Sequence, residues 1–295
     1  MKETTHTSVD LSLWFMPQSL TALSFTSEYE RLTEPQRLRY NQLHGLYLNE
    51  QTAFFEKTLA PALTYFLKSP GITNDLREKL REFAREEQRH TVMFRELNRR
   101  AGGSLYQDGD SCFVRISRPA TRLLNSIAAR PNLFPFILWL MHLQEERALY
   151  FGRQFTSCEH PIEPNFLQTQ RIHIADEAGH VSCDKDLLDS VWPGTNYFIR
   201  YVNVRLLAWL MREFFGPPKR AQILIVSRLA AELPELQSRL PTLKRALLAL
   251  SNDQRFLRAM YSRENVPEAF ARFDRTPELW PLARVLPGYE PQIAA

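Results

Sequence analysis

The chain has 295 residues, a formal net charge of +4, 44% hydrophobic residues and 24% charged residues. This composition is ordinary for a globular protein with a sizeable core, and it excludes collagen-like, low-complexity and wholly disordered chains. The 37 basic residues are dispersed, without a basic stripe, so we expect no nucleic-acid partner. Three widely spaced cysteines, Cys112, Cys158 and Cys183, argue against a disulfide scaffold and favour a reducing compartment.

Neither a targeting segment nor a membrane span is predicted. Residues 1–9 are polar and rich in threonine, without the charged-then-apolar order of a signal peptide. The most apolar run, residues 133–141, is about half the length that a bilayer requires, and it contains Pro135. We therefore expect a cytoplasmic protein with no membrane partner.

Apolar residues at helical spacing, separated by proline, glycine and asparagine, predict an all-α fold. The long helices are expected over residues 28–68, 76–100, 133–156 and 165–190. Short connections join the helices within each pair, and a longer loop with a short helix joins the two pairs. This is the layout of a four-helix bundle with one crossover.

Three regions are expected along the chain. Residues 1–27 form an N-terminal arm, and residues 28–215 form the helical bundle. Gly216-Pro217-Pro218 is the sharpest break in the sequence. Residues 216–295 then supply shorter helices and a proline-rich tail from residue 276, expected to be irregular, which pack on the bundle.

Two of the predicted helices carry a Glu-x-x-His motif. Glu87 and His90 lie in the second helix, and Glu177 and His180 lie in the fourth, where His173 extends the same stripe. Residues three and four apart project from one face of a helix. A buried stripe of carboxylates and imidazoles needs a partner, which a metal ion supplies. Oxygen and nitrogen ligands without thiolates favour iron or manganese over structural zinc.

A metal-free interpretation is also open, because surface helices rich in Glu, Arg and His produce such pairs by chance. Both pairs, however, lie mid-helix among apolar neighbours, and each follows another acid, Glu86 or Asp176. They also occupy the second and fourth helices, where carboxylate-bridged di-iron bundles place them. We expect Glu86 and Asp176 to orient the histidines as second-shell acids.

A di-iron bundle places one further glutamate on each remaining helix. The candidates are Glu50 and Glu56 in the first helix, and Glu145 and Glu146 in the third. If the two halves are pseudo-repeats, each of these glutamates should precede its Glu-x-x-His motif by the same separation. This condition selects Glu56 and Glu146, and it leaves Glu50 and Glu145 as open alternatives.

Three motifs together carry a family resemblance. They are Asn-Glu-x-x-x-x-x-Glu in the first helix, Glu-x-x-His-Thr in the second and His-x-x-Asp-Glu-x-x-His in the fourth, within residues 40–190. Together they resemble the p-aminobenzoate N-oxygenase family of di-iron oxygenases. His173 is the most specific feature, because ferritins, reductase small subunits and bacterial methane monooxygenases lack a ligand there. The resemblance implies a ferritin-like fold and these metal ligands: Glu56, Glu87, His90, Glu146, His173, Glu177 and His180.

The resemblance also implies two iron ions as cofactors, O2 as co-substrate, a small-molecule amine substrate and an external electron donor. Oxygen would go to the amine nitrogen, toward hydroxylamine and nitro, in specialised metabolism. Three other functions stay open: hydroxylation or desaturation of a C–H bond on a small or carrier-tethered substrate, iron binding as a ferroxidase, and metal-free helical interaction. The mild basic charge would suit an acidic carrier protein, and a homodimer is an open assembly.

Other polar residues near the motifs have plainer interpretations. His142, one turn before Glu146, is expected to be a buried or pocket-lining histidine, with an eighth ligand as the alternative. Arg89 and Arg147 are expected to be solvated helix arginines, and a carboxylate-binding role is the alternative. Phe151 is expected to pack in the core, with a pocket wall as the alternative.

Overall fold

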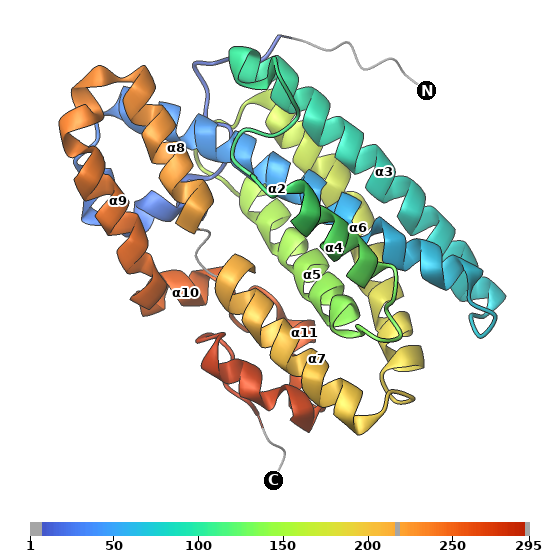
Figure 1. Cartoon of the computed structure of the whole chain (residues 1–295). Coiled ribbons are helices and arrows are strands. Elements are labelled where there is room, and N and C mark those ends of the chain that lie inside the picture. The colour runs from blue at the N-terminus through green and yellow to red at the C-terminus, as the bar shows by residue number, and fades with distance from the viewer. Residues whose placement is uncertain (1–7, 216–218, 293–295) are drawn as a thin grey trace.

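The computed structural model describes residues 8–215 and 219–292. Within these residues the structure is helical, and β-structure is limited to one isolated bridge between Trp14 and Ile162. The predicted all-α fold is confirmed (Figure 1). No helix in these two ranges is long and apolar enough to cross a membrane.

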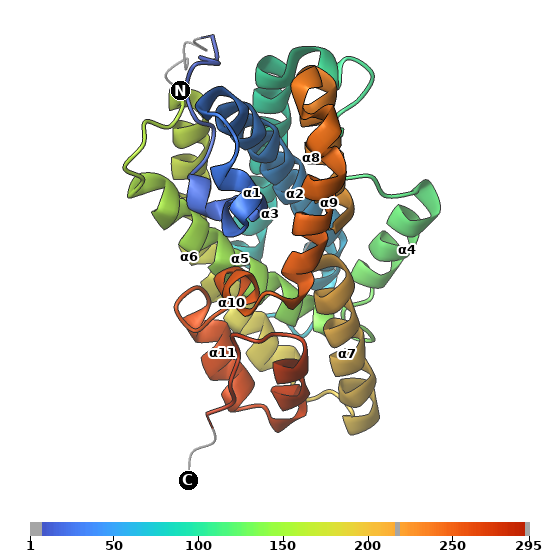
Figure 2. The same cartoon turned by 90° about the vertical axis from the view of Figure 1, so that its left-hand side faces the viewer.

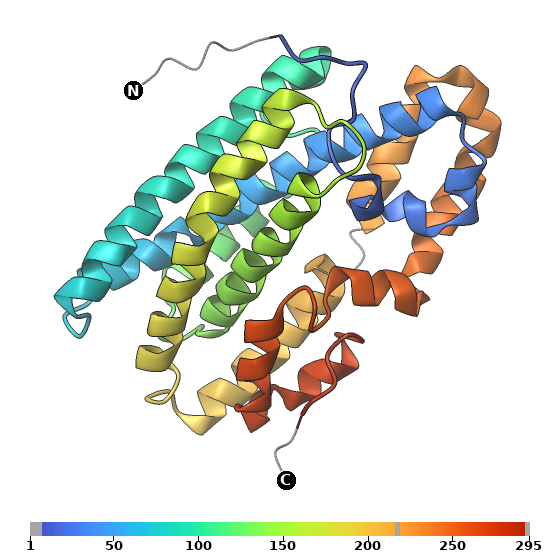
Figure 3. The same ribbon diagram turned by 180° about the vertical axis from the view of Figure 1, so that it is seen from behind.

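Four long helices form the bundle. They are α2 (Glu34–Lys68), α3 (Asn74–Gly102), α5 (Phe136–Thr156) and α6 (Pro164–Val191). Helix α2 packs along α3, α5 packs along α6, and α3 also contacts α6, which is seen from behind in Figure 3. The crossover between the pairs contains η3 (Gly103–Tyr106) and α4 (Arg118–Ala128). The predicted four-helix bundle with one crossover is confirmed.

The first long helix begins later than predicted. A separate turn, α1 (Ser27–Glu30), precedes it, and α2 begins at Glu34 rather than at residue 28. The backbone N–H of Thr33 donates a 3.0 Å hydrogen bond to the side chain of Gln36, which fixes the start of the helix. Pro35 follows in the first turn, where a missing N–H costs nothing.

The C-terminal third adds helices around the bundle. They are α7 (Tyr197–Leu210), the π-helical turn η4 (Met211–Phe215), α8 (Lys219–Glu232), η5 (Pro234–Arg239), α9 (Leu240–Ala249), η6 (Leu250–Asn252), α10 (Gln254–Met260), α11 (Pro267–Asp274) and η7 (Pro277–Arg284). Helix α8 packs on α2, whereas α7 and α11 pack on α5 (Figure 2). The tail predicted to be irregular contains the 3₁₀ helix η7, whose buried Leu279 and Leu282 hold it on the core. Residues 216–218, the predicted break, lie outside the described residues.

The second helix of the bundle shows why the metal motif is buried. One face of helix α3 points toward the interior of the bundle, and its buried apolar residues include Leu76, Leu80, Phe83, Phe94 and Leu97. Glu87 and His90 lie in the middle of this face and are buried with it. The helical period therefore carries two polar side chains into the centre of the bundle.

Candidate metal centre

A cluster of buried carboxylates and imidazoles lies at the centre of the bundle. Each of the four long helices contributes to it. Its members are Glu56 from α2, Glu87 and His90 from α3, Glu145 from α5, and His173, Glu177 and His180 from α6. None of these residues is more than 5% exposed. The structure thus brings together six of the seven predicted ligands, and Glu145 joins them.

The cluster divides into two groups of potential ligands. Glu56, His90 and His173 form one group, and Glu87, Glu145, Glu177 and His180 form the other. Within each group, one ligand atom of every residue lies within 4.8 Å of the others. Glu177 adjoins both, because its Oε1 lies 2.9 Å from His173 Nε2 and 3.5 Å from His180 Nδ1. Two neighbouring ion sites sharing Glu177 would fit this arrangement.

The polar atoms that face the centre of this cluster are unsatisfied. The buried atoms without a hydrogen-bond partner among the described residues include Glu56 Oε1, Glu87 Oε1, His90 Nδ1, both carboxylate oxygens of Glu177, and His180 Nδ1. Burying so many polar atoms without partners is costly, and bound cations would remove that cost. Carboxylate oxygens and imidazole nitrogens without thiolates are also the donors that suit iron. The residues present therefore fit a pair of iron ions.

Two acidic side chains contact His90 and His180 on the side of each ring that points away from the cluster. Asp176 Oδ2 lies 2.8 Å from His90 Nε2, and Glu86 Oε2 lies 3.1 Å from His180 Nε2. Each contact crosses between α3 and α6, so the acid of one helix supports the histidine of the other. With Nε2 engaged, Nδ1 of each ring faces the cluster. Glu86 and Asp176 therefore contact the histidines from outside the cluster.

The carboxylates of the cluster attract positive charge. Burial alone would lower the pKa of His173, but the nearby carboxylates of Glu177 and Glu56 outweigh it and raise this pKa to about 10. Burial raises the pKa of Glu56 to about 7. Burial and the neighbouring carboxylates also raise the pKa of Glu87. In the absence of a metal, protons therefore supply the charge that cations would provide.

Glu146, predicted as a ligand, does not face the cluster. Its carboxylate accepts hydrogen bonds from the backbone N–H groups of Glu268, at 2.7 Å, and Ala269, at 2.8 Å, in the first turn of α11. Consecutive residues of a helix point about 100° apart, so only one of two adjacent glutamates can face α6. The separation between the two motifs and their glutamates therefore differs by one residue, and Glu145, not Glu146, lies in the cluster.

Glu50, the alternative ligand on the first helix, binds the crossover loop instead of the cluster. Its carboxylate accepts hydrogen bonds from the hydroxyls of Tyr106 and Ser111. It accepts three more from the backbone N–H groups of residues 112–114, each at 2.8 Å. Glu50 therefore ties the crossover loop to α2, and Glu56 is the glutamate that enters the cluster.

His142 is fully buried, in agreement with the prediction of a buried histidine. It precedes Glu146 by four residues, so both lie on the side of α5 that faces α11. Burial and the nearby Arg272 lower its pKa to about 4. His142 belongs to neither group of potential metal ligands.

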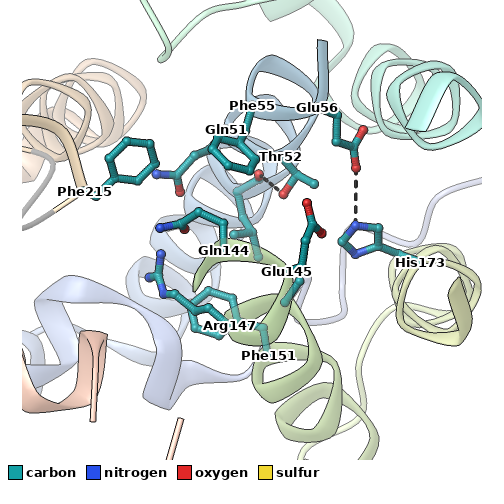
Figure 4. A pocket seen from close by; sticks show the side chains of 12 residues that line it. Gln51, Thr52, Phe55, Glu56, Gln144, Glu145, Arg147, Phe151, His173 and Phe215 are labelled. Atoms are coloured by element: carbon teal, nitrogen blue, oxygen red, sulfur yellow. Dashed lines mark hydrogen bonds and ion pairs between the residues drawn. The ribbon is translucent and has the colours of Figure 1, made fainter. Parts of the chain in front are cut away.

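A pocket adjoins the cluster, between α2, α5, α6 and η4 (Figure 4). Glu56, Glu145 and His173 line one side of it, so a molecule bound there would lie against the candidate ligands. The other lining residues include the aromatic rings of Phe55, Phe151 and Phe215, and the polar side chains of Gln51, Gln144 and Arg147. No motif in the sequence marked Gln51, Gln144 or Phe215. Phe151 packs against the hydrophobic core, as predicted, and it also lines this pocket.

The two arginines differ from each other. Arg89 is about half exposed and pairs with Asp176, as a solvated helix arginine can. Arg147 is only 8% exposed, so the prediction that it is solvated is wrong. Arg147 contacts Met260, the last residue of α10, and Tyr261, which follows that helix.

Comparison with known families decides the interpretation of this cluster. The family model of the p-aminobenzoate N-oxygenase AurF matches residues 3–240. The chain belongs to this family. AurF-family proteins are ferritin-like di-iron N-oxygenases, so this protein is a non-haem di-iron oxygenase that uses two irons and O2. Among the curated proteins, none matches the chain.

Proposed function

We propose that seven residues hold the two irons of this N-oxygenase: Glu56, Glu87, His90, Glu145, His173, Glu177 and His180. The unsatisfied buried atoms that converge at the centre of the bundle carry this proposal. Glu56, His90 and His173 would serve one iron, and Glu87, Glu145 and His180 the other. Glu177 would be shared, because its Oε1 adjoins a histidine of each group.

The substrate that this site supports best is a small arylamine. AurF is named for the N-oxygenation of p-aminobenzoate. The pocket supports a substrate of this kind, because Phe55, Phe151 and Phe215 offer aromatic walls to a ring. An amine that entered with its nitrogen toward Glu56 and Glu145 would meet the metal ligands.

The reaction requires an electron donor besides the amine. In the first step one atom of O2 is added to the amine nitrogen, which gives a hydroxylamine, and the other atom leaves as water. The amine supplies two electrons, and the donor supplies two electrons that enter with two protons. The bound irons would supply the redox chemistry that activates O2. Further oxygenation of the same nitrogen would lead to the nitro compound.

The chain's own residues would fix the ligands. Asp176 and Glu86 would hold the rings of His90 and His180 in place through Nε2. The hydroxyl of Thr91 donates a 3.2 Å hydrogen bond to Glu56 Oε2, which leaves Oε1 toward the cluster. Phe83 stacks on the ring of His180, with centroids 3.9 Å apart, and shields it from water.

Two measurements test this function together. Anaerobic titration with ferrous iron should saturate near two irons per chain. The reduced, loaded protein should then convert p-aminobenzoate and O2 to its hydroxylamine and nitro products, followed by chromatography and mass spectrometry. Oxygen uptake that yields ferric iron alone would favour a ferroxidase, and hydroxylation of carbon would favour a C–H oxygenase. Failure to bind iron would contradict the ligand assignment.

A further inference from the structure

The pocket contains a buried positive charge that the metal centre does not explain. Arg147 has no carboxylate partner within ion-pair distance among the described residues, and its buried Nε makes no hydrogen bond. Its remaining polar contacts are long: Nη1 lies 3.5 Å from the hydroxyl of Tyr261, and Nη2 lies 3.6 Å from Met260 Sδ. A buried guanidinium without a counter-charge is costly, so an anion that enters the pocket would find a prepared partner.

Aromatic residues fix the direction of this guanidinium. Its central carbon lies 4.5 Å from the ring centroid of Phe151 and 4.9 Å from that of Tyr261. The Tyr261 hydroxyl also accepts a 2.8 Å hydrogen bond from Gln144 Nε2. Tyr261 thus holds two neighbouring side chains of the pocket wall, Gln144 and Arg147.

The polar groups of the pocket lie at two separate places. In Figure 4 the amide ends of Gln51 and Gln144 and the guanidinium of Arg147 gather on one side. The candidate ligands Glu56 and His173 lie on the other side. A substrate spanning this pocket would place one end at the metal ligands and its other end at the guanidinium.

We propose that Arg147 binds an anionic group of the substrate, a carboxylate on the arylamine ring, and that Tyr261 positions Arg147 for this contact. The planar guanidinium matches a carboxylate with two parallel hydrogen bonds, and Gln144 stands beside it. The amine nitrogen, at the other end of the ring, then lies against Glu145. This inference rests on the proposed function, because it assumes that the pocket receives the amine.

The segment that positions Arg147 lies outside the matched family region. The family model ends at residue 240, whereas Met260 and Tyr261 lie beyond it. Glu146 anchors the same part of the chain by binding the N-terminus of α11. The C-terminal helices, which carry no ligand candidate, would therefore set the preference of the pocket for acidic substrates.

The first experiment compares an acid with its neutral analogue on the iron-loaded enzyme. For wild type, kcat/KM should be higher with p-aminobenzoate than with its methyl ester, which has the same amine and ring. Arg147→Gln should lower the ratio of kcat/KM for the acid to kcat/KM for the ester by about 10- to 100-fold. Arg153→Gln is the matched control, because Arg153 is an exposed arginine of the same helix.

A binding measurement separates this proposal from the proposed function. Calorimetry with benzoate and benzamide, which cannot be N-oxygenated as arylamines, should show that wild type prefers benzoate and that Arg147→Gln loses the preference. Arg147→Lys, which keeps the charge, should recover part of it and show that the loss is not general unfolding. If wild type oxidises no arylamine but still binds benzoate through Arg147, only the proposed function fails.

Tyr261→Phe tests the positioning role. It keeps the ring over the guanidinium and removes only the hydroxyl that contacts Gln144 and Arg147. We expect KM for the acid to rise about three- to tenfold, by a larger factor than KM for the ester, and iron content to stay at the wild-type value. The proposal is overturned if wild type does not favour the acid, or if Arg147→Gln keeps the wild-type ratio of acid to ester.

Discussion

Glu145 and Glu146 are adjacent in α5, yet their carboxylates bind to different parts of the molecule. Glu145 Oε2 lies 3.9 Å from His180 Nδ1, inside the metal cluster. Glu146 accepts hydrogen bonds from the backbone N–H groups of Glu268 and Ala269 at the start of α11. One turn of α5 therefore carries both a candidate iron ligand and the anchor of the C-terminal helices.

Removal of the anchor should cost stability without affecting iron. Glu146→Ala leaves two backbone N–H groups at the start of α11 without their acceptor. We expect the free energy of unfolding to fall by about 1–3 kcal/mol, measured by urea denaturation of the iron-loaded protein. Iron content per folded chain should stay at the wild-type value. A variant as stable as wild type would show that this contact does not anchor α11.

The second-shell acids should govern iron affinity. Asp176→Asn and Glu86→Gln keep the shape of each side chain but weaken its hold on His90 or His180. The affinity for ferrous iron should fall about 10- to 100-fold, measured anaerobically by competition with a coloured chelator. Glu82→Gln, one turn before Glu86 and exposed, is the control and should leave the affinity unchanged. Equal affinities in all four proteins would exclude the orienting role.

Two glycines near the site should respond in opposite ways to alanine. A Cβ at Gly152 would lie 2.8 Å from the Cβ of Ile174, where α5 and α6 cross next to His173. Gly152→Ala should therefore lower the free energy of unfolding by about 1–3 kcal/mol. A Cβ at Gly179 would have no atom within 4 Å, so Gly179→Ala should raise it by about 0.5–1 kcal/mol. Chemical denaturation measures the free energy of unfolding of each variant. Equal changes in the two variants would contradict the close contact between α5 and α6 at Gly152.

Iron binding should tighten as the pH rises. Burial raises the pKa of Glu56 to about 7, so in the metal-free protein this carboxyl holds a proton below that pH. The pKa of His173 is raised to about 10, so it too must lose a proton to bind a metal. Because iron competes with these protons, its affinity should increase from about pH 6 to pH 8. Anaerobic titrations across this range measure it, and an affinity independent of pH would contradict the proton displacement.

Part of this centre could be predicted from sequence, because helical spacing is local. Glu87 and His90 are three residues apart, and so are Glu177 and His180, which already places each pair on one face of its helix. The choice between Glu145 and Glu146 could not be predicted from the sequence, since it depends on how α5 is rotated against α6 and α11. Because the two halves of the bundle differ by one residue, the condition of equal separation selects Glu146, whereas Glu145 faces the cluster.

The residues that line the pocket could be predicted from the sequence even less than the metal ligands. Arg147 looks like an ordinary helix arginine until Tyr261, more than a hundred residues later, covers it. Phe215 reaches the pocket from η4, after the last helix of the bundle. Contacts between segments so far apart leave no local pattern of spacing.

The most direct test of the di-iron assignment is the iron content per chain after anaerobic loading, compared among wild type, Glu145→Gln and Glu146→Gln. We predict about two irons for wild type and for Glu146→Gln, and a clear loss for Glu145→Gln. The assignment is contradicted if wild type binds no iron, or if Glu146→Gln loses iron while Glu145→Gln keeps it.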